Sequence, residues 1–150
     1  MEKLEYKKQL VQTCIDMLEE SIQTAKETIE ELQQSANEYE GDNDIFDSFK
    51  ADLMKKKDMH IQQYQKYKEE LKILLKIPLD QLHDTVKFGS VVVTDKQKML
   101  VSVSLGTVHF NGDKYIAIST QVPIFNAMRD LKAGDSFDFN KNTFKIKSIF

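Results

Sequence analysis

Apolar residues recur at alternating intervals of four and three positions over the first quarter of the chain, and this pattern restricts what the chain can fold into. From Leu4 to Ala36 they fall on two interleaved heptad rows: Leu4, Val11, Leu18, Ala25, Leu32 and Ile15, Ile22, Ile29, Ala36. Such spacing, sustained over several heptads, is typical of a coiled-coil seam rather than of a globular helix face. About 33 residues at about 1.5 Å each predict a rod of roughly 50 Å, which is too long for the core helix of a small domain.

A second helical pattern runs from about Ile45 to Lys76 and is less regular. Its apolar residues are Phe46, Phe49, Leu53, Met54, Ile61, Tyr64, Tyr67, Leu71 and Leu74. Lys50, Lys57 and His60 stand where the repeat requires apolar residues, so we expect weaker packing near the turn than at the opposite end of the pair. His60 has no second His or Cys beside it and is interpreted as a structural flank residue rather than a metal ligand.

Ten residues between the two patterns, Glu38 to Asp47, carry five carboxylates and no basic side chain. Gly41 marks a turn because glycine adopts a positive φ at no steric cost. Pro78 ends the second pattern, since proline keeps the preceding residue out of the α region. We therefore predict that residues 1–78 form an antiparallel coiled-coil hairpin with an acidic tip near residues 38–47. The tip is either an ordinary solvated turn or a group of carboxylates presented to a hard divalent cation such as Mg²⁺.

The spacing of the tip aspartates decides how such a cation would be held. Asp44 and Asp47 lie three positions apart and share one face of the first turn of the second helix. A cation at the tip would therefore meet both of them together with Asp42. Two or three carboxylates, with water in the remaining positions, bind Mg²⁺ weakly. Such a tip would act only where another molecule supplies the other ligands.

Beyond a linker that begins at Pro78, the pattern changes to alternating and β-branched residues. We predict strands at Val86–Thr94, Met99–Leu105, Tyr115–Ser119, Ser136–Phe139 and Phe144–Ile149, and one helix at Pro123–Leu131. Asn111-Gly112 is a strong hairpin signal between the second and third strands, and Lys141-Asn142 would connect the last two. Residues 84–150 are therefore predicted to form a small antiparallel sheet with one helix, and the whole chain an α+β protein of two domains.

Charge and hydropathy narrow the class of function. The net charge of −3 divides into −5 over residues 1–78, with 12 Lys against 17 acidic residues, and +2 over residues 79–150, with 9 basic against 7 acidic residues. Neither part is basic enough to predict autonomous DNA or RNA binding. No apolar run approaches a membrane span, and the N-terminus lacks the apolar core of a signal peptide. We expect a cytoplasmic protein without a membrane partner, and an intramolecular hairpin makes a monomer the simplest expectation.

Motifs for autonomous catalysis are absent from the sequence of residues 84–150. This part has no Ser or Cys nucleophile with a base at a recognisable spacing, no phosphate-binding loop and no acid pair of glycosidase type. We therefore do not expect an autonomous enzyme. Cys14, the single cysteine, excludes an internal disulfide, and its place in the first helical pattern predicts a buried hydrophobe rather than a nucleophile.

Several short patterns occur in a fixed order in the carboxy-terminal half. Val86 to Thr94 reads Val-Lys-Phe-Gly-Ser-Val-Val-Val-Thr, and further patterns are Ile118-Ser119, Pro123-Ile124, Ala127-Met128, Lys132-Ala133-Gly134-Asp135 and, from Phe144, Phe-Lys-Ile-Lys-Ser-Ile. Together with a long helical pair and an acidic turn before them, these patterns resemble the Gre family of bacterial transcript cleavage factors. The resemblance covers both halves and implies an antiparallel coiled coil followed by a domain like the FK506-binding proteins.

The resemblance also implies a partner and a mechanism. Members of the family dock on RNA polymerase through the carboxy-terminal domain and insert the coiled coil into the secondary channel. Their tip carboxylates help to hold a second Mg²⁺ and its water while the polymerase hydrolyses backtracked RNA near the nascent 3′ end. Carried over onto this sequence, Asp42 and Asp44 match the catalytic carboxylates that share Mg²⁺ with the polymerase, with Asp47 in support. The docking loop corresponds to Val122, Pro123 and Ile124, where Val122 replaces a serine of the family.

Aspartates also replace both tip glutamates of the family, and their side chains reach about 1.5 Å less, the length of one carbon–carbon bond. This leaves open a Gre-like protein that occupies the channel and inhibits the polymerase or modulates pausing without stimulating cleavage. From a different class, a sheet with one helix and a hairpin able to clamp clients is consistent with a prolyl isomerase or chaperone. A further interpretation is a structural adaptor whose acidic tip is only a soluble turn.

Overall fold

The computed structural model describes the backbone of residues 2–38 and 44–150 and the side chains of residues 2–38 and 47–150. The chain forms two compact units. Met1–Ile15 and Ile73–Phe150 make up the first, which we term the sheet unit, and Asp16–Lys72 make up the second, which we term the hairpin unit. The boundary between the units falls within the two long helices and not at the linker that follows them.

Two long helices come first in the chain, α1 (Lys3–Glu38) and α2 (Asp44–Leu74). The elements that follow are β1 (Val91–Thr94), β2 (Lys98–Ser102), β3 (Gly106–Phe110), β4 (Asp113–Ser119), α3 (Pro123–Met128), β5 (Ser136–Phe139) and β6 (Asn142–Ile149). The predicted α+β class is confirmed, with a long helical hairpin followed by a small, mostly antiparallel sheet and one short helix. The 36 residues of α1 correspond to a length of about 54 Å.

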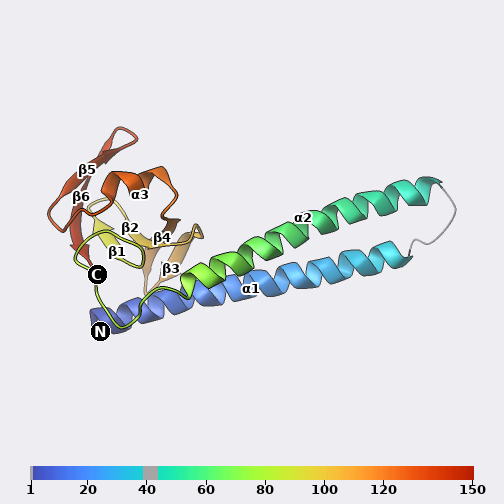
Figure 1. Ribbon diagram of the computed structural model, residues 1–150, viewed down its shortest axis with the longest axis horizontal. Coiled ribbons are helices and arrows are strands. Elements are labelled where there is room, and N and C mark those ends of the chain that lie inside the picture. The colour runs from blue at the N-terminus through green and yellow to red at the C-terminus, as the bar shows by residue number, and fades with distance from the viewer. Residues whose placement is uncertain (1, 39–43) are drawn as a thin grey trace. The chain divides into compact units, whose positions relative to one another are not determined.

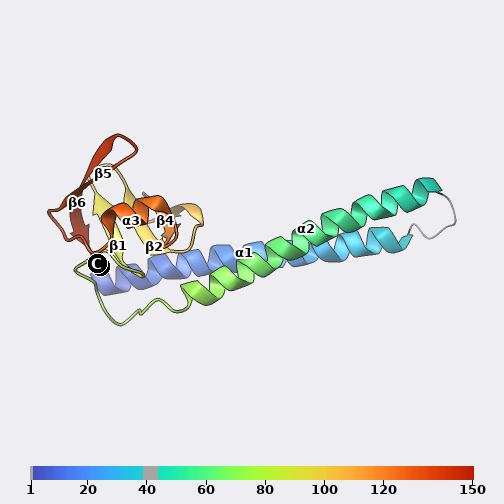
Figure 2. The ribbon, with the colours of Figure 1, turned by 45° about the horizontal axis from the view of Figure 1, so that its top comes forward.

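In the hairpin unit, α1 and α2 run side by side in opposite directions (Figures 1 and 2). The heptad rows predicted for α1 form its inner face here. None of these seam residues is exposed: Leu18, Ala25 and Ala36 are buried, and Ile22, Ile29 and Leu32 are half-buried. The apolar spacing of the sequence therefore identified the packed side of this helix correctly.

The facing side of α2 is less well covered than that of α1, as its irregular seam predicts. Its seam residues from Leu53 to Leu71 are half-buried, whereas Phe49, closer to the acidic segment, keeps 45% of its surface exposed. Lys57 occupies a seam position and donates a hydrogen bond to the side chain of Gln33 on α1. A polar bridge therefore takes the place of apolar packing at this level of the hairpin.

The sheet has the strand order β3-β4-β2-β1-β6-β5. Neighbouring strands are antiparallel except β2 and β4, which pair in parallel from Lys98 opposite Tyr115 to Ser102 opposite Ser119. The sequence predicts a purely antiparallel sheet, and this detail is wrong. An additional strand, β3, lies between β2 and β4 in the chain and runs antiparallel to β4 at the sheet edge, so that β4 returns in the direction of β2.

The additional strand carries a weak sequence signal. Val108 is the one fully buried residue among its five, and Gly106 and His109 are exposed. Asn111 and Gly112 have positive φ angles of 52° and 81° and connect β3 to β4, as a two-residue hairpin turn of type I′ requires. The predicted hairpin turn is thus present, but its first strand is β3 and not β2.

The strand predicted from Val86 begins only at Val91. Gly89 interrupts the extended backbone with a φ of 90°, and a Cβ at this position would lie only 3.3 Å from Cγ2 of Ile77. The backbone conformation therefore favours glycine here, and any larger residue would also have to displace the Ile77 side chain slightly.

Further strand boundaries differ from the prediction. β2 ends at Ser102, three residues before the predicted Leu105, and β4 and β6 begin two residues earlier than predicted, at Asp113 and Asn142.

Two more differences coincide with positive φ angles. α3 ends at Met128 instead of Leu131, because the chain leaves the helix and Asp130 adopts a φ of 63°. The last hairpin turns at Asn140 and Lys141, with φ angles of 51° and 65°, one residue earlier than expected.

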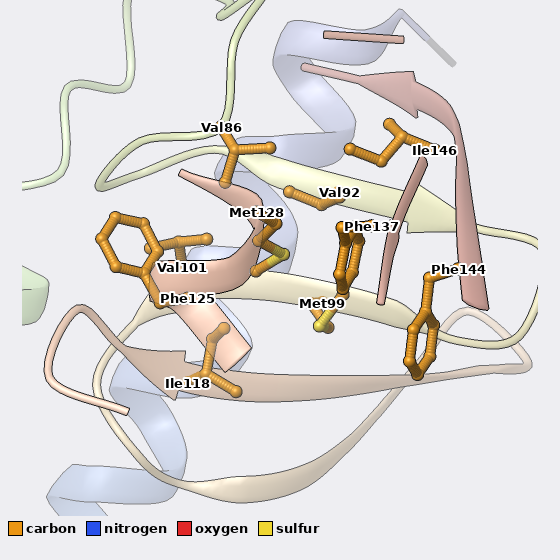
Figure 3. Packing of buried hydrophobic residues seen from close by; sticks show 10 residues of the cluster. All are labelled: Val86, Val92, Met99, Val101, Ile118, Phe125, Met128, Phe137, Phe144 and Ile146. Carbon is orange, nitrogen blue, oxygen red and sulfur yellow. The ribbon is translucent and has the colours of Figure 1, made fainter. Parts of the chain in front are cut away.

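One face of the sheet and α3 enclose a hydrophobic core, whose side chains converge in Figure 3. The rings of Phe137 and Phe144 stack with centroids 5.0 Å apart and an interplanar angle of 8°. Met128, at the end of α3, is fully buried. The ten core residues are Val86, Val92, Met99, Val101, Ile118, Phe125, Met128, Phe137, Phe144 and Ile146.

The first turns of α1 cover the opposite face of the sheet. Alternate residues of β2 point away from α3, and Leu100 among them is nevertheless fully buried. The hydroxyl of Tyr6 lies 2.7 Å from the hydroxyl of Tyr115 on β4. The Tyr6 ring meets those of Phe110 and Phe150 edge-on, with centroid distances of 5.0 and 6.1 Å. Within the sheet unit, both faces of the sheet are therefore packed.

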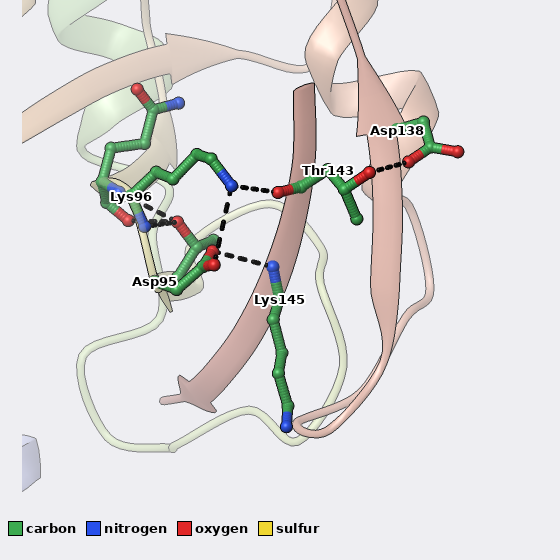
Figure 4. Close-up of polar contacts among 7 residues, drawn as sticks. Asp95, Lys96, Asp138, Thr143 and Lys145 are labelled. Carbon is green, nitrogen blue, oxygen red and sulfur yellow. Dashed lines mark hydrogen bonds and ion pairs between the residues drawn. The ribbon is translucent and has the colours of Figure 1, made fainter. Parts of the chain in front are cut away.

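A polar cluster connects the turn after β1 to the last two strands (Figure 4). The carboxylate of Asp95 accepts a hydrogen bond from the backbone N–H of Lys145 at 2.9 Å and pairs with Lys96 at 3.6 Å. Lys96 also donates to the carbonyl of Thr143, whose hydroxyl donates to Asp138 at 2.6 Å. The Lys145 N–H lowers the pKa of Asp95 below its ordinary value, because it stabilises the charged carboxylate.

Replacement of Met128 by Ala tests the core under α3. Met128 has no exposed surface, so Met128→Ala is expected to lower the free energy of unfolding by about 2 to 5 kcal/mol, through lost burial and the cavity left behind. Urea denaturation followed by near-UV circular dichroism measures this change. Met59, which is 69% exposed on α2, provides the control, and Met59→Ala should stay within about 0.5 kcal/mol of wild type. Equal effects of the two variants would contradict the described core.

Replacement of Lys57 by Leu tests the seam of the hairpin. Since Lys57 is half-buried between the helices, an apolar side chain there should raise stability by about 1 kcal/mol. Thermal unfolding followed by far-UV circular dichroism detects the increase. Lys56→Leu, at the adjacent exposed position, should give no such gain, and a gain of equal size there would show that the seam has been placed on the wrong side of α2.

Candidate functional site

The acidic segment lies between the ends of the two hairpin helices. α1 ends at Glu38, which is exposed, and α2 begins at Asp44. Asp42 lies outside the described residues, as does the side chain of Asp44. Asp47, in the first turn of α2, is exposed to solvent. Of the three predicted tip carboxylates, Asp47 is therefore the one whose side chain the structure describes.

A basic stretch follows the acidic segment along α2. Lys55 and Lys56 are exposed, and Lys50 and Lys57 are half-buried. The same helix thus presents the carboxylate of Asp47 in its first turn and ammonium groups within the next four turns. An anionic partner at this part of the hairpin would meet these lysines, whereas a cation would be attracted to the acidic end.

A groove of about 390 Å³ opens between α1 and α2 in the hairpin unit. Small α1 residues such as Ser21 and Ala25 line one side, and His60, Gln63 and Tyr67 of α2 line the other. In the parts of the chain with described side chains, no three His, Cys, Asp or Glu residues lie close enough together to hold a metal ion. A cation at the tip would need Asp42 and Asp44, whose side chains lie outside the described residues.

The predicted docking residues form the start of α3. Val122 has an extended backbone, with φ −85° and ψ 149°, and precedes Pro123 at the beginning of the helix. Proline is favourable here because the first N–H groups of a helix have no helical acceptor. Val122 and Ile124 are half-buried against the core, whereas Pro123 is exposed. Of these three residues, Pro123 presents the most side-chain surface to a partner.

Two further exposed residues continue the surface that begins at Pro123. Arg129, the only arginine in the sequence, places its guanidinium 5.2 Å from the ring centroid of Phe125 and donates a hydrogen bond of 3.1 Å to Asn126. Pro123, Asn126 and Arg129 are exposed, and we term these three residues the α3 edge. Pro123 and Asn126, three residues apart, share one face of α3, and Arg129 at the end of the helix is tied to them by its hydrogen bond to Asn126.

Cys14 carries no reactive thiol. The residue is fully buried in the sheet unit, and burial raises the pKa of its thiol to about 12. The nucleophilic thiolate is therefore scarce at neutral pH. The prediction of a buried hydrophobe at this position is confirmed.

The described groups that bear on the predicted tip and docking surface are the carboxylate of Asp47, the lysines that follow it, and the α3 edge. None of the described helices combines the length and the apolar character that crossing a membrane requires. Comparisons of the chain with protein-family models, with curated proteins and with solved structures gave no match.

Proposed function

We propose that this protein is a transcription elongation factor of Gre type, which binds bacterial RNA polymerase and supplies carboxylates for Mg²⁺-dependent cleavage of backtracked RNA by the polymerase itself. The observation that carries the proposal is the place of the acidic segment. Its five carboxylates fall between the end of α1 at Glu38 and the first turn of α2, which ends near Asp47. The Gre-like residue patterns after Val86 support the same assignment.

The tip residues suit a shared metal site rather than a complete one. Asp42, Asp44 and Asp47 offer the oxygen ligands that Mg²⁺ prefers, but at most three carboxylates leave half or more of an octahedral shell to water or to another molecule. Mg²⁺ bound between the tip and the polymerase would supply a Lewis acid and an activated water. The exposure of Asp47 fits this role, because its side chain can reach a ligand set outside the chain.

The basic stretch of α2 fits an RNA end better than a duplex. Lys55 and Lys56 are exposed and follow the acidic segment by about two turns of helix. A few ammonium groups can pair with one or two phosphates of a transcript. They are too few to hold nucleic acid without the polymerase, which agrees with a contact to the nascent 3′ end only within the complex.

A stalled, backtracked polymerase complex tests the role of the tip. With the wild-type protein, Mg²⁺-dependent shortening of the RNA is expected to accelerate. The double variant Asp42→Ala with Asp44→Ala should stimulate cleavage roughly 10- to 100-fold less than wild type. Removal of groups that support a metal site typically causes a loss of this size. Asp58→Ala is the matched control, because Asp58 is an exposed carboxylate on the same helix but outside the acidic segment, and it should retain full stimulation.

The assay also separates stimulation from inhibition. The shorter reach of aspartate favours, as a second candidate, a protein that occupies the channel without completing the metal site. Slower elongation with no release of short 3′ fragments would support this inhibitor and contradict the cleavage factor. Catalysis of proline-limited refolding without polymerase would instead support a prolyl isomerase.

Replacement of Pro123 tests docking through the α3 edge. Pro123→Glu introduces a charge on an exposed side chain, and glutamate is tolerated in the first turn of a helix. We expect the affinity for core RNA polymerase to fall about tenfold, as it does when one central contact of an interface is lost. Titration of labelled protein with the polymerase measures this affinity. Ser136→Glu, at an exposed position of β5, should bind like wild type, and unchanged binding of Pro123→Glu would exclude this edge as the docking surface.

A further inference from the structure

A buried lysine lies where α1 meets the linker between α2 and β1. Lys7 has no exposed surface, and its Nζ atom donates a hydrogen bond of 3.4 Å to the backbone carbonyl of Gln81. Among the described side chains, no carboxylate pairs with it. Burial, with a smaller contribution from Lys87, lowers the pKa of Lys7 to about 8. The amine is therefore still mostly protonated at neutral pH, as a buried cation without an anion beside it.

His83 is the second titratable residue of this site. It is 8% exposed, and its Nε2 atom is buried with no hydrogen-bond partner in the described part of the chain. Gly89 packs beside it, since a Cβ at this position would lie in van der Waals contact with Nε2, at 3.5 Å. This nitrogen is therefore held in a dry, closely packed position, where the neutral imidazole is the favoured form.

The charges that face His83 are not balanced. Burial makes the largest contribution to lowering the pKa of His83; Lys7 on α1 and Lys87 on the segment before β1 act in the same direction. Asp84 acts in the opposite direction, but it is exposed to solvent. A proton on His83 would add a second buried positive charge near Lys7 without a buried carboxylate to compensate it, which is unfavourable.

We propose that Lys7 and His83 form a pH-sensitive latch that holds the first turns of α1 against the linker of residues 77–90. The latch is closed while the imidazole is neutral. Protonation of His83 opens it, because separation of α1 from the linker lets water solvate both cations. This device lies entirely within the sheet unit and does not depend on what the hairpin binds.

The direction of the pH effect follows from proton linkage. The pKa of His83 in the closed latch lies below the ordinary value of 6.5, so the open state binds more protons as the pH falls below 6.5. The closed latch is therefore most stable above this pH and loses stability below it, until the pH reaches the lowered pKa. Lys7 acts in a separate alkaline window, because loss of its proton between about pH 8 and 10.5 stabilises the closed state.

An NMR titration of the His83 imidazole in the full chain tests the charge coupling. The midpoint in the folded protein is expected to lie below that of the same histidine in the urea-unfolded chain. Lys7→Met removes the neighbouring cation and should move the folded midpoint upward, whereas Lys8→Met, at the adjacent exposed lysine, should leave it unchanged. A folded midpoint at or above the unfolded one, or no shift in Lys7→Met, would overturn the latch.

Hydrogen exchange tests the opening itself. As the pH is lowered from above 6.5 to below it, protection factors of amides in residues 6–14 and 83–90 should fall more than those of β2 and β4. His83→Gln should abolish this local loss, and His109→Gln, at an exposed histidine of β3, should retain it. A loss that is uniform over the sheet, or that persists in His83→Gln, would disprove the proposal. Should His83→Gln fail to fold, the titrations of wild type and Lys7→Met still decide the question.

Discussion

The structure depends on one continuous helix, α1, that packs against two different neighbours. In the sheet unit it buries Lys7, Leu10 and Cys14, which are spaced by three and four residues and so share one face. In the hairpin unit its heptad rows from Leu18 onward are buried or half-buried and face α2. The boundary between the compact units falls within α1, directly after Ile15.

This use of α1 explains how a small sheet can contain a parallel strand pair. Parallel strands are found mainly where both faces of the sheet are covered, and β2, which pairs in parallel with β4, is buried along nearly its whole length. α3 covers one face and the start of α1 covers the other through Tyr6. A domain of about 65 residues alone would bury too little apolar surface for an ample core. The first turns of the hairpin helix therefore belong to the folding unit of the sheet.

The sequence predicted the elements with the longest repeats best. The seam of α1 was identified because nine apolar positions follow one heptad repeat. The Asn111-Gly112 turn was identified because Asn and Gly readily adopt the positive φ angles of a two-residue hairpin turn.

β3 was missed because a five-residue edge strand with one buried side chain has almost no alternating signal. The burial of Lys7 has no signal in the sequence, because heptad spacing describes contacts between the two long helices and contains no information about what α1 packs against in the sheet unit. At the candidate site, the sequence predicted the helix ends on either side of the acidic segment. It did not predict that Val122 and Ile124 are half-buried, because their burial depends on the fold of the core.

The chemistry of the acidic segment couples the proposed metal to the proposed partner. In free solution, water screens the five carboxylates from one another, so their repulsion costs little and their affinity for Mg²⁺ is low. Inside a narrow channel of another protein, screening is weaker and the same charges repel strongly unless a cation lies among them. The partner would therefore bind the tip more tightly when the metal is present, and the metal more tightly when the tip is present, by the same factor. Low metal affinity of the free tip is an advantage for a factor of this kind. The shared cation is then bound only at the site where the reaction takes place.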